Sequence, residues 1–443
     1  MKLPKDFESY FRECWEAEAA DALISGLQGE PSVSIRLNTA RLPLDAEPEG
    51  ADGRVPWCPE GIYLKSRPLF TADPLLHAGT YYVQEASSMF LAHVLRTIFP
   101  HTSYVAHHTS AVLDLCAAPG GKSTLLRSLL PDDCLLVSNE PVRARVQVLA
   151  ENMAKWGHPN VMVTQAFAAD IAETVRRGGR KKGGRWEAFD LILADVPCSG
   201  EGMMRKEEEA VRQWSPALVA ECAALQRSIV ADIWPALRPG GHLIYSTCTF
   251  NPEEDEQNVE WIARELGADI VPIPVDPSWG IVGDVRRRHP STLIPHPLPP
   301  ISFCHFIPGK VRGEGFFCAV LRKHGSETVL QEDRPSRKRL GKKGDRRETR
   351  DENLTILPTD LLEATDAPRV ELALPEAIRY LQHEALVLSS DTPCGIVQVC
   401  YQGQRLGLVK NLGSRANNLY PKEWRIRAAN ITPHSLFTGL LQR

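Results

Sequence analysis

The sequence is poor in the residues that mark metal-binding or disulfide-stabilised proteins. Only eleven of its 443 residues are cysteines, and none of them forms a C-x-x-C pair. This excludes the common structural zinc patterns and a disulfide-dense secreted scaffold. We therefore expect free thiols in a reducing cytoplasm and no metal centre.

Long hydrophobic runs and a strong net charge are also missing. Nowhere do eighteen apolar residues follow one another, so no membrane contact is expected. The start, MKLPKDFESYFREC, has no apolar segment after its basic residues, so no signal peptide is predicted. A net charge of −4 argues against a surface that is basic throughout. Two local basic runs stand out, at Arg176–Arg185 and Arg334–Arg350.

Apolar patterning divides the chain into four predicted parts. Residues 1–105 combine a helical pattern with a strand at 32–40 and predict an accessory α+β domain. Residues 106–325 alternate short strands with helices, which predicts an α/β, Rossmann-like parallel sheet covered on both faces. Residues 326–353 form a charged linker and 354–443 a small third domain. The expected strands are 111–118, 134–140, 160–165, 189–196 and 241–249, with an antiparallel hairpin of 301–308 and 314–323 at the sheet edge.

The segment VLDLCAAPGGKSTLL ends like a phosphate-binding loop, but it lacks one essential glycine. A P-loop needs G-x-x-x-x-G-K-[ST], and Cys116 stands where the first glycine should be. The alternative is a strand that turns at Gly120-Gly121 into a helix whose N–H groups face a polar ligand. Glu140 ends the next strand, where such folds bind ribose hydroxyls, unless it only caps the following helix. S-adenosylmethionine is the leading candidate for the cofactor bound at this turn.

Two cysteines follow two later strands, in LILADVPCSGEGMMRK and HLIYSTCTFNPEEDEQNV. Since parallel strands end at one edge of a sheet, Cys198 and Cys248 are expected to be neighbours, with Asp195 beside them. A thiolate that adds to carbon 6 of a pyrimidine makes carbon 5 nucleophilic enough to accept a methyl group. Asp195 is placed to contact the ring nitrogen, and Lys206 to hold the base or favour a thiolate. Spacing alone does not decide which cysteine attacks.

These motifs, in their order and spacing, resemble those of the RNA 5-methylcytosine methyltransferases of the Nop2/Sun (RsmB/RsmF) family. The segments LPKDF, SIRLNT, HAGTYYVQEASSM and GSRANNLYPKEWRIR resemble the RsmF branch, which acts on small-subunit ribosomal RNA. The resemblance covers essentially the whole chain. It implies a Rossmann-like S-adenosylmethionine-dependent methyltransferase core, an N-terminal RNA-binding domain and a C-terminal PUA-like domain.

The resemblance also implies residue roles. Cys248 is the expected nucleophile, and Cys198 the residue that helps to break the covalent adduct. The cofactor is expected to contact Cys116, Ala117, Ala118, Pro119, Gly120, Gly121, Lys122, Glu140 and Asp195. Relatives often carry an acid directly after the third strand, whereas here Gln165 to Phe167 occupy that place. Either Asp170, which follows slightly later, or backbone groups are therefore expected to contact the adenine of the cofactor.

RNA is the expected partner, and the chain is expected to be a monomer. Candidate contacts are Arg36, Asn38, the loop 176–185 and the C-terminal segment 415–427, although each also fits a solvated charged face, and Tyr420 and Trp424 also fit a core. Tyr81-Tyr82 is expected to pack between domains. Asn251 is expected to cap a helix that fixes the Cys248 loop, with no catalytic role for the acids of that helix. Transfer RNA as substrate, or a non-catalytic ribosome-assembly factor that binds RNA, are the alternatives.

Overall fold

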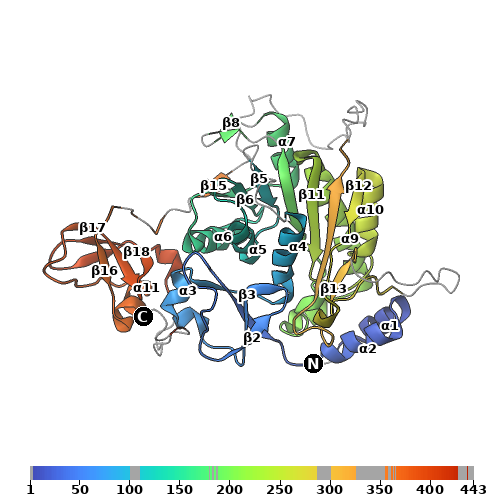
Figure 1. Cartoon of the computed structure of the whole chain (residues 1–443), viewed down its shortest axis with the longest axis horizontal. Helices are drawn as coiled ribbons and strands as arrows, with labels where there is room; N and C mark the ends of the chain where they lie inside the picture. The colour runs from blue at the N-terminus through green and yellow to red at the C-terminus, as the bar shows by residue number, and fades with distance from the viewer. Residues whose placement is uncertain are drawn as a thin grey trace.

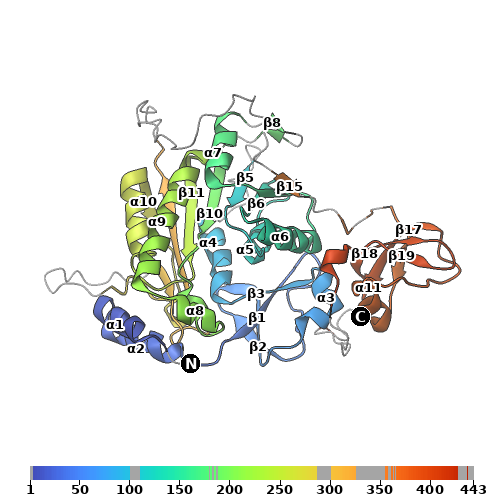
Figure 2. The same ribbon diagram turned by 180° about the vertical axis from the view of Figure 1, so that it is seen from behind.

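The computed structural model describes residues 3–99, 110–178, 180–181, 184–185, 188–286, 301–325, 355–357, 361–362, 364, 366–427 and 437. Figures 1 and 2 show a central sheet flanked by helices, with a second sheet beside it near the N-terminus and a third sheet at the C-terminal end of the molecule. The predicted linker 326–353 lies outside the described residues, as does part of the basic loop 176–185.

The central sheet has the strand order β12-β14-β11-β10-β5-β6-β7-β15. Its five parallel strands are the five predicted from sequence, β5 (Ala111–Asp114), β6 (Leu135–Asn139), β7 (Val161–Gln165), β10 (Phe189–Asp195) and β11 (Leu237–Thr247). Consecutive strands run outward from β5 through β6 to β7, and the chain then crosses to β10 on the other side. The sheet therefore reverses direction beside β5, where open α/β sheets bind their ligands.

Alternation along β10 explains why helices cover both faces of this sheet. Leu191 and Leu193 are buried in one apolar cluster, and Ile192 and Ala194 in another. The first cluster includes residues of α4 (Leu91–Ile98), α5 (Gly121–Leu129) and α6 (Arg143–Trp156). The second includes residues of α7 (Ala168–Arg176), α9 (Pro216–Ile233) and α10 (Glu256–Leu266).

The predicted hairpin forms, with β14 one strand in from the sheet edge. β13 (Cys304–Phe306) pairs antiparallel with β14 (Phe316–Lys323), and β14 lies between β11 and the short strand β12 (Ala268–Val271). Because β13 and β12 pair with different parts of β14, β13 lies at the edge as predicted and β12 shares that edge. At the opposite edge, β15 (Thr355–Leu357) pairs with β7, so these residues belong to the central sheet.

The N-terminal sheet has the order β2-β3-β1-β4, formed by β1 (Val33–Leu37), β2 (Ala51–Val55), β3 (Cys58–Leu64) and β4 (Tyr81–Val83). The expectation that Arg36 and Asn38 contact RNA is wrong. Arg36 is 2% exposed, donates to Gln84 and Thr124, and stacks on the ring of Trp156. Asn38 is buried and donates to the carbonyls of Gly79 and Trp156. Both residues fasten the N-terminal domain to the central one.

The C-terminal sheet has the order β16-β17-β18-β19, from β16 (Arg369–Glu371), β17 (Gly395–Tyr401), β18 (Gln404–Asn411) and β19 (Ala416–Asn418), with α11 (Leu374–Leu381). Tyr420 is 1% exposed and packs on Tyr380 and Trp424, so it is a core residue rather than a base-stacking one. One apolar cluster joins this domain to the N-terminal domain, because Ile35 and Tyr81 belong to it together with Tyr380 and Phe437.

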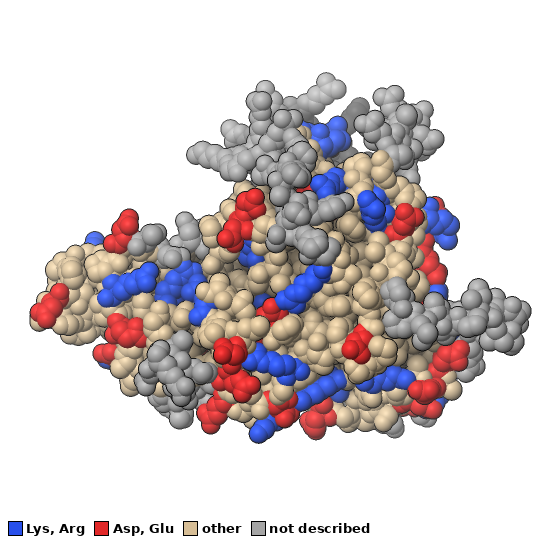
Figure 3. Space-filling view, in the orientation of Figure 1, with Lys and Arg blue, Asp and Glu red and all other residues tan. Residues whose placement is uncertain are grey.

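Two N-terminal helices, α1 (Lys5–Cys14) and α2 (Ala17–Gly26), pack against the central domain on the side of β13. Phe11 and Trp15 contact Phe250, which lies two residues after Cys248. The remaining short elements are α3 (Pro74–His77), α8 (Glu208–Gln213), β8 (Arg180–Lys181) and β9 (Gly184–Arg185). Among the described helices, none is long and apolar enough to cross a bilayer. On the face drawn in Figure 3, basic and acidic side chains are interspersed.

Candidate active site

The predicted site residues follow the carboxyl ends of neighbouring strands. Residues 116–122 follow β5, Glu140 follows β6, Asp195 ends β10 and Cys248 follows β11. Because β11, β10, β5 and β6 are adjacent and parallel, these groups share one edge of the sheet. The strand order thus brings together residues up to 132 positions apart, as between Cys116 and Cys248.

A glycine allows the tight turn after β5, and an asparagine at the end of β6 holds the turn in place. Gly120 has φ 117°, a conformation that other residues rarely adopt, and α5 begins at Gly121. Tyr82 lies against Gly121, which confirms the predicted interdomain packing of this tyrosine. Asn139 donates from Nδ2 to the carbonyls of Leu115 and Ala166, 3.0 Å away in each case. It therefore fixes the loops after β5 and β7 relative to each other.

Glu140 is 1% exposed, and its two oxygens have different surroundings. Oε1 accepts a hydrogen bond from the N–H of Val142 at 3.0 Å. Oε2 accepts no hydrogen bond among the described residues and lies 3.4 Å from the Arg145 guanidinium. A buried carboxylate oxygen without a hydrogen bond is unfavourable unless a ligand supplies a donor. A ribose hydroxyl is such a donor.

Asp195 accepts hydrogen bonds from two sides. Oδ2 lies 2.8 Å from Lys122 Nζ, and Oδ1 lies 2.8 Å from the Ser246 hydroxyl. Burial acts against the charge of Lys122, but the Asp195 carboxylate outweighs it and raises the lysine pKa. Lys122 therefore stays cationic and links the turn after β5 to the end of β10. The carboxylate retains partial exposure, with 27% of its side chain accessible.

The two cysteines meet as predicted. Cys198 Sγ lies 3.0 Å from Cys248 Sγ. Both side chains are half-buried, which leaves them within reach of a bound molecule. The hydrogen bond with Cys248, burial and the negative charge of a Cys248 thiolate all raise the pKa of Cys198. One sulfur is therefore ionised more easily than both together.

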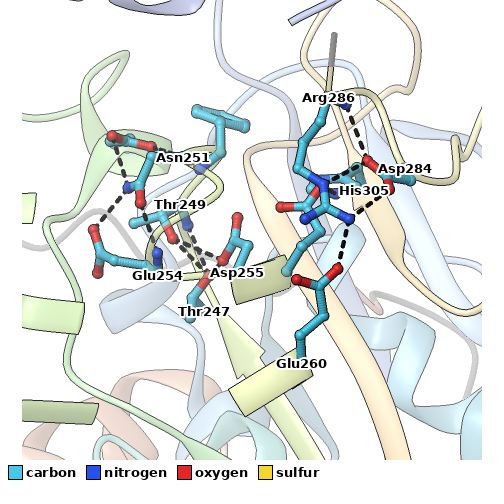
Figure 4. Close-up of polar contacts among 12 residues, drawn as sticks. Thr247, Thr249, Asn251, Glu254, Asp255, Glu260, Asp284, Arg286 and His305 are labelled. Atoms are coloured by element: carbon cyan, nitrogen blue, oxygen red, sulfur yellow. Dashed lines mark hydrogen bonds and ion pairs between the residues drawn. The ribbon is translucent and has the colours of Figure 1, made fainter. Parts of the chain in front are cut away.

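Hydroxyl and carboxyl groups hold the residues on either side of Cys248 (Figure 4). Thr247 and Thr249 donate to Asp255 Oδ1 at 2.6 and 3.1 Å. Asn251 caps the turn 252–255, because its Oδ1 accepts a hydrogen bond from the N–H of Glu254. The helix α10 begins after this turn, at Glu256, which is later than the sequence predicted. Further along, Arg286 binds Glu260 and Asp284, and His305 binds Glu256. These contacts agree with a structural role for the acids near the start of α10.

The other two predicted residues are Lys206 and Asp170. Lys206 Nζ lies 3.3 Å from Glu314 Oε1, in a cluster where Arg205 Nε also binds Glu314 at 2.8 Å. Asp170 lies in the first turn of α7, after β7. Its assignment to the adenine end of the cofactor remains a prediction.

Two buried acids at this edge were not predicted from the sequence. Asp114 ends β5 with 0% exposure, and burial raises its pKa to about 7. Glu201 lies three residues after Cys198 and is also fully buried. An acid within the predicted strand 111–118, and another between two glycines in SGEGMM, are the only signals that the sequence offers.

A Rossmann-like sheet, a glycine turn beside a buried carboxylate, and a thiol pair at the same edge define the class of a methyltransferase with paired cysteines. Comparison with known protein families gives the same class. Residues 104–322 match the family "16S rRNA methyltransferase RsmB/F", residues 3–86 the "N-terminal domain of 16S rRNA methyltransferase RsmF", and residues 367–426 the "Methyltransferase RsmF PUA domain".

Relatives that match along nearly their whole length identify the family more specifically. Ribosomal RNA small subunit methyltransferase F of Cronobacter sakazakii is 31% identical over 498 residues, covering 95% of this chain and 96% of the relative. The protein of the same name from an Enterobacter species is 30% identical, with 95% of each covered. The chain belongs to the ribosomal RNA small subunit methyltransferase F family, whose members are S-adenosylmethionine-dependent.

Solved structures share the fold. A methyltransferase homolog protein from Pyrococcus horikoshii superimposes with a TM-score of 0.53 at 24% identity, covering 72% of this chain and 95% of that one. NSun6 from the same organism, solved with SFG, gives 0.52 at 20% identity, covering 72% and 98%. These likenesses support the Rossmann-like architecture predicted from the sequence.

Proposed function

We propose that this protein methylates carbon 5 of cytosine in small-subunit ribosomal RNA through a cysteine-linked covalent intermediate. The observation that carries the proposal is the 3.0 Å separation of Cys198 Sγ and Cys248 Sγ at the sheet edge that also holds Asp195. A methyltransferase that acts on an already nucleophilic atom needs no thiol. Carbon 5 of cytosine does need covalent activation.

The residues around the turn fit S-adenosylmethionine. Glu140 Oε2 is buried without a hydrogen bond and suits a ribose hydroxyl, and the loop 116–122 offers backbone N–H groups at the start of α5. Asp170 is assigned to the adenine side. When bound, the cofactor supplies an electrophilic methyl group.

Cys248 acts first in the proposed reaction. Its thiolate adds to carbon 6 of cytosine, and the electrons of the 5,6 double bond move onto the ring, which makes carbon 5 nucleophilic. Asp195 shares a proton with the ring nitrogen, where negative charge would otherwise develop, and Lys122 and Ser246 hold the Asp195 side chain in place. Carbon 5 then forms its bond to the methyl group as the bond between that group and the cofactor sulfur breaks, which would leave S-adenosylhomocysteine.

Cys198 acts second. Once the Cys248 sulfur is bonded to carbon 6, its negative charge no longer raises the pKa of Cys198. Cys198 can then lose its proton to solvent, accept the proton from carbon 5, and so let the carbon–sulfur bond break with release of the Cys248 thiolate. This order uses one thiolate at a time, as the short sulfur–sulfur distance requires.

The test is a methylation assay with product identification. Purified protein is incubated with labelled S-adenosylmethionine and either small-subunit ribosomal RNA or transfer RNA, and the digested nucleosides are separated by mass spectrometry. We expect label in 5-methylcytidine from ribosomal RNA. Label in another nucleoside, or in transfer RNA alone, would contradict the proposal.

A further inference from the structure

The loops that carry the two cysteines are tied together by two glutamates, one from each loop. The first loop contains Cys198, Ser199 and Glu201, and the second contains Cys248, Asn251 and Glu254. Their backbones also meet directly, since the N–H of Gly202 donates to the carbonyl of Cys248 at 2.7 Å. A side chain at Gly202 would collide with that carbonyl, so the approach requires glycine.

Glu201 reaches from the Cys198 loop to the Cys248 loop. Its Oε2 accepts from the N–H groups of Phe250 and Asn251 at 2.6 and 3.1 Å. Its Oε1 accepts from Trp214 Nε1 at 2.8 Å and from Asn251 Nδ2 at 3.0 Å. The side chain is 0% exposed, so no water replaces these donors.

Glu254 makes the opposite connection. Its Oε2 accepts from the N–H of Ser199, the residue after Cys198, at 3.0 Å and from Gln226 Nε2 at 2.6 Å. Its Oε1 accepts from Asn251 Nδ2 at 2.7 Å. Asn251 therefore donates to both glutamates, and each cysteine loop is held by a carboxylate from the other.

Each carboxylate oxygen of this pair accepts from at least one N–H donor. A glutamine at either position has nearly the same shape but directs an NH₂ group at a donor, so at least one contact must break. The fold itself suffers less, because burial and the neighbouring Glu254 act against the charge of Glu201 and raise its pKa, and an uncharged amide removes that burial cost.

We propose that Glu201 and Glu254 are positioning residues for the two-cysteine reaction, each fixing the cysteine of the opposite loop. Glu201 orients Cys248 for attack, and Glu254 orients Cys198 for breakdown of the adduct. The proposal rests on the proposed function, since it assigns a step to each glutamate. It predicts opposite defects for two residues of the same type in the same network.

The experiment compares Glu201→Gln and Glu254→Gln, with Glu265→Gln as the matched control. Glu265 lies on α10 and contacts Arg264 at the surface. Each protein is incubated with small-subunit RNA and S-adenosylmethionine, and protein-linked RNA is measured on a denaturing gel beside methyl transfer. Displacing a reacting group by about 1 Å costs roughly 100-fold in rate, so methyl transfer should fall about 10- to 100-fold in both glutamine variants.

The amount of covalent adduct distinguishes the two glutamine variants. With Glu254→Gln we expect protein-linked RNA to accumulate to about five times the wild-type level or more, because Cys198 no longer resolves it. With Glu201→Gln we expect adduct and methyl transfer to fall together. If both variants match the wild type, or if both lose adduct in proportion to a loss of melting temperature, the positioning roles are overturned.

A second readout does not depend on RNA. Hydrogen peroxide converts the thiol pair to a disulfide, forming one S–S bond while peroxide is reduced to two waters that take up the thiol protons. Peptide mapping should show Cys198–Cys248 disulfide forming about fivefold more slowly in both glutamine variants than in Glu265→Gln, because the sulfurs are no longer held together. Wild-type rates in both would contradict the positioning roles. If the wild-type protein did not methylate cytosine, the proposed function would be refuted. The rate of disulfide formation would still show whether the glutamates hold the two sulfurs together.

Discussion

Lys122 Nζ lies 2.8 Å from Asp195 Oδ2, so an ion pair joins the turn after β5 to the end of β10. The pair brings a residue predicted for cofactor binding onto the carboxylate predicted to face cytosine. Replacing Lys122 with methionine keeps the length of the side chain but leaves Asp195 with the Ser246 hydroxyl as its remaining partner in the described structure. We expect kcat/KM to fall about 10- to 100-fold.

The matched variant is Lys122→Arg, which retains a cation. It should recover part of the lost activity if charge beside Asp195 is what matters. Steady-state kinetics on the same RNA, with melting temperature as a check on folding, distinguishes the two variants. Equal activity of wild type and Lys122→Met would show that the ion pair plays no part in turnover.

Glu140 should contribute to cofactor affinity through its buried Oε2. Glu140→Ala is expected to weaken S-adenosylmethionine binding by about tenfold or more, since a hydrogen bond to a charged group stabilises by roughly 1.5–3 kcal/mol. Calorimetric titration measures this directly, with Asp133→Asn as an exposed control. Asp170→Ala, in the same titration, tests whether Asp170 reaches the adenine. Unchanged affinity in Glu140→Ala would mean that this glutamate only caps the chain at Val142.

Asp114 should make stability depend on pH. Its pKa is about 7 in the fold, because of burial, against an ordinary value of 3.8. Between these values the folded protein keeps a proton that the unfolded chain releases. The stabilising contribution of Asp114 is therefore fully present below about pH 4 and is lost as the pH rises toward 7. The loss attributable to this group is on the order of 4 kcal/mol.

Asp114→Asn removes that contribution, and its stability relative to the wild type should therefore increase from pH 5 to pH 7.5. Urea unfolding of both proteins without cofactor at the two pH values measures the difference. A constant difference across this range would show that Asp114 does not titrate there.

Arg36 should matter for stability rather than for RNA affinity. Arg36→Met leaves the buried Gln84 Oε1 without its 2.8 Å donor and removes the interdomain hydrogen bond to Thr124, at a cost of about 1–3 kcal/mol. A lower melting temperature with unchanged RNA affinity is the expected result, and Lys65→Met serves as an exposed control. Weaker RNA binding at an unchanged melting temperature would restore the original expectation of an RNA contact.

The sequence was informative where the interactions are local or follow strand order. The five parallel strands and the meeting of Cys198 with Cys248 were predictable, because short apolar strands alternate with helices and parallel strands end at one edge. The place of β14 was not, since β12 has only four residues and carries little pattern of its own.

Contacts between distant segments were not predictable in the same way. Arg36 finds its partners 48 and 88 positions away, and nothing in SIRLN distinguishes a buried arginine from an RNA contact. The contact of Glu201 with Phe250 likewise spans 49 positions. Long-range hydrogen bonds of this kind depend on how loops pack after the strands are in place.

The most direct test of the covalent mechanism compares Cys198→Ala with Cys248→Ala, each incubated with small-subunit RNA and S-adenosylmethionine and examined on a denaturing gel. Cys198→Ala should accumulate protein-linked RNA, while Cys248→Ala should give neither adduct nor 5-methylcytidine. The reverse pattern would show that Cys198 is the nucleophile, and methylation by both variants would show that neither thiol is required.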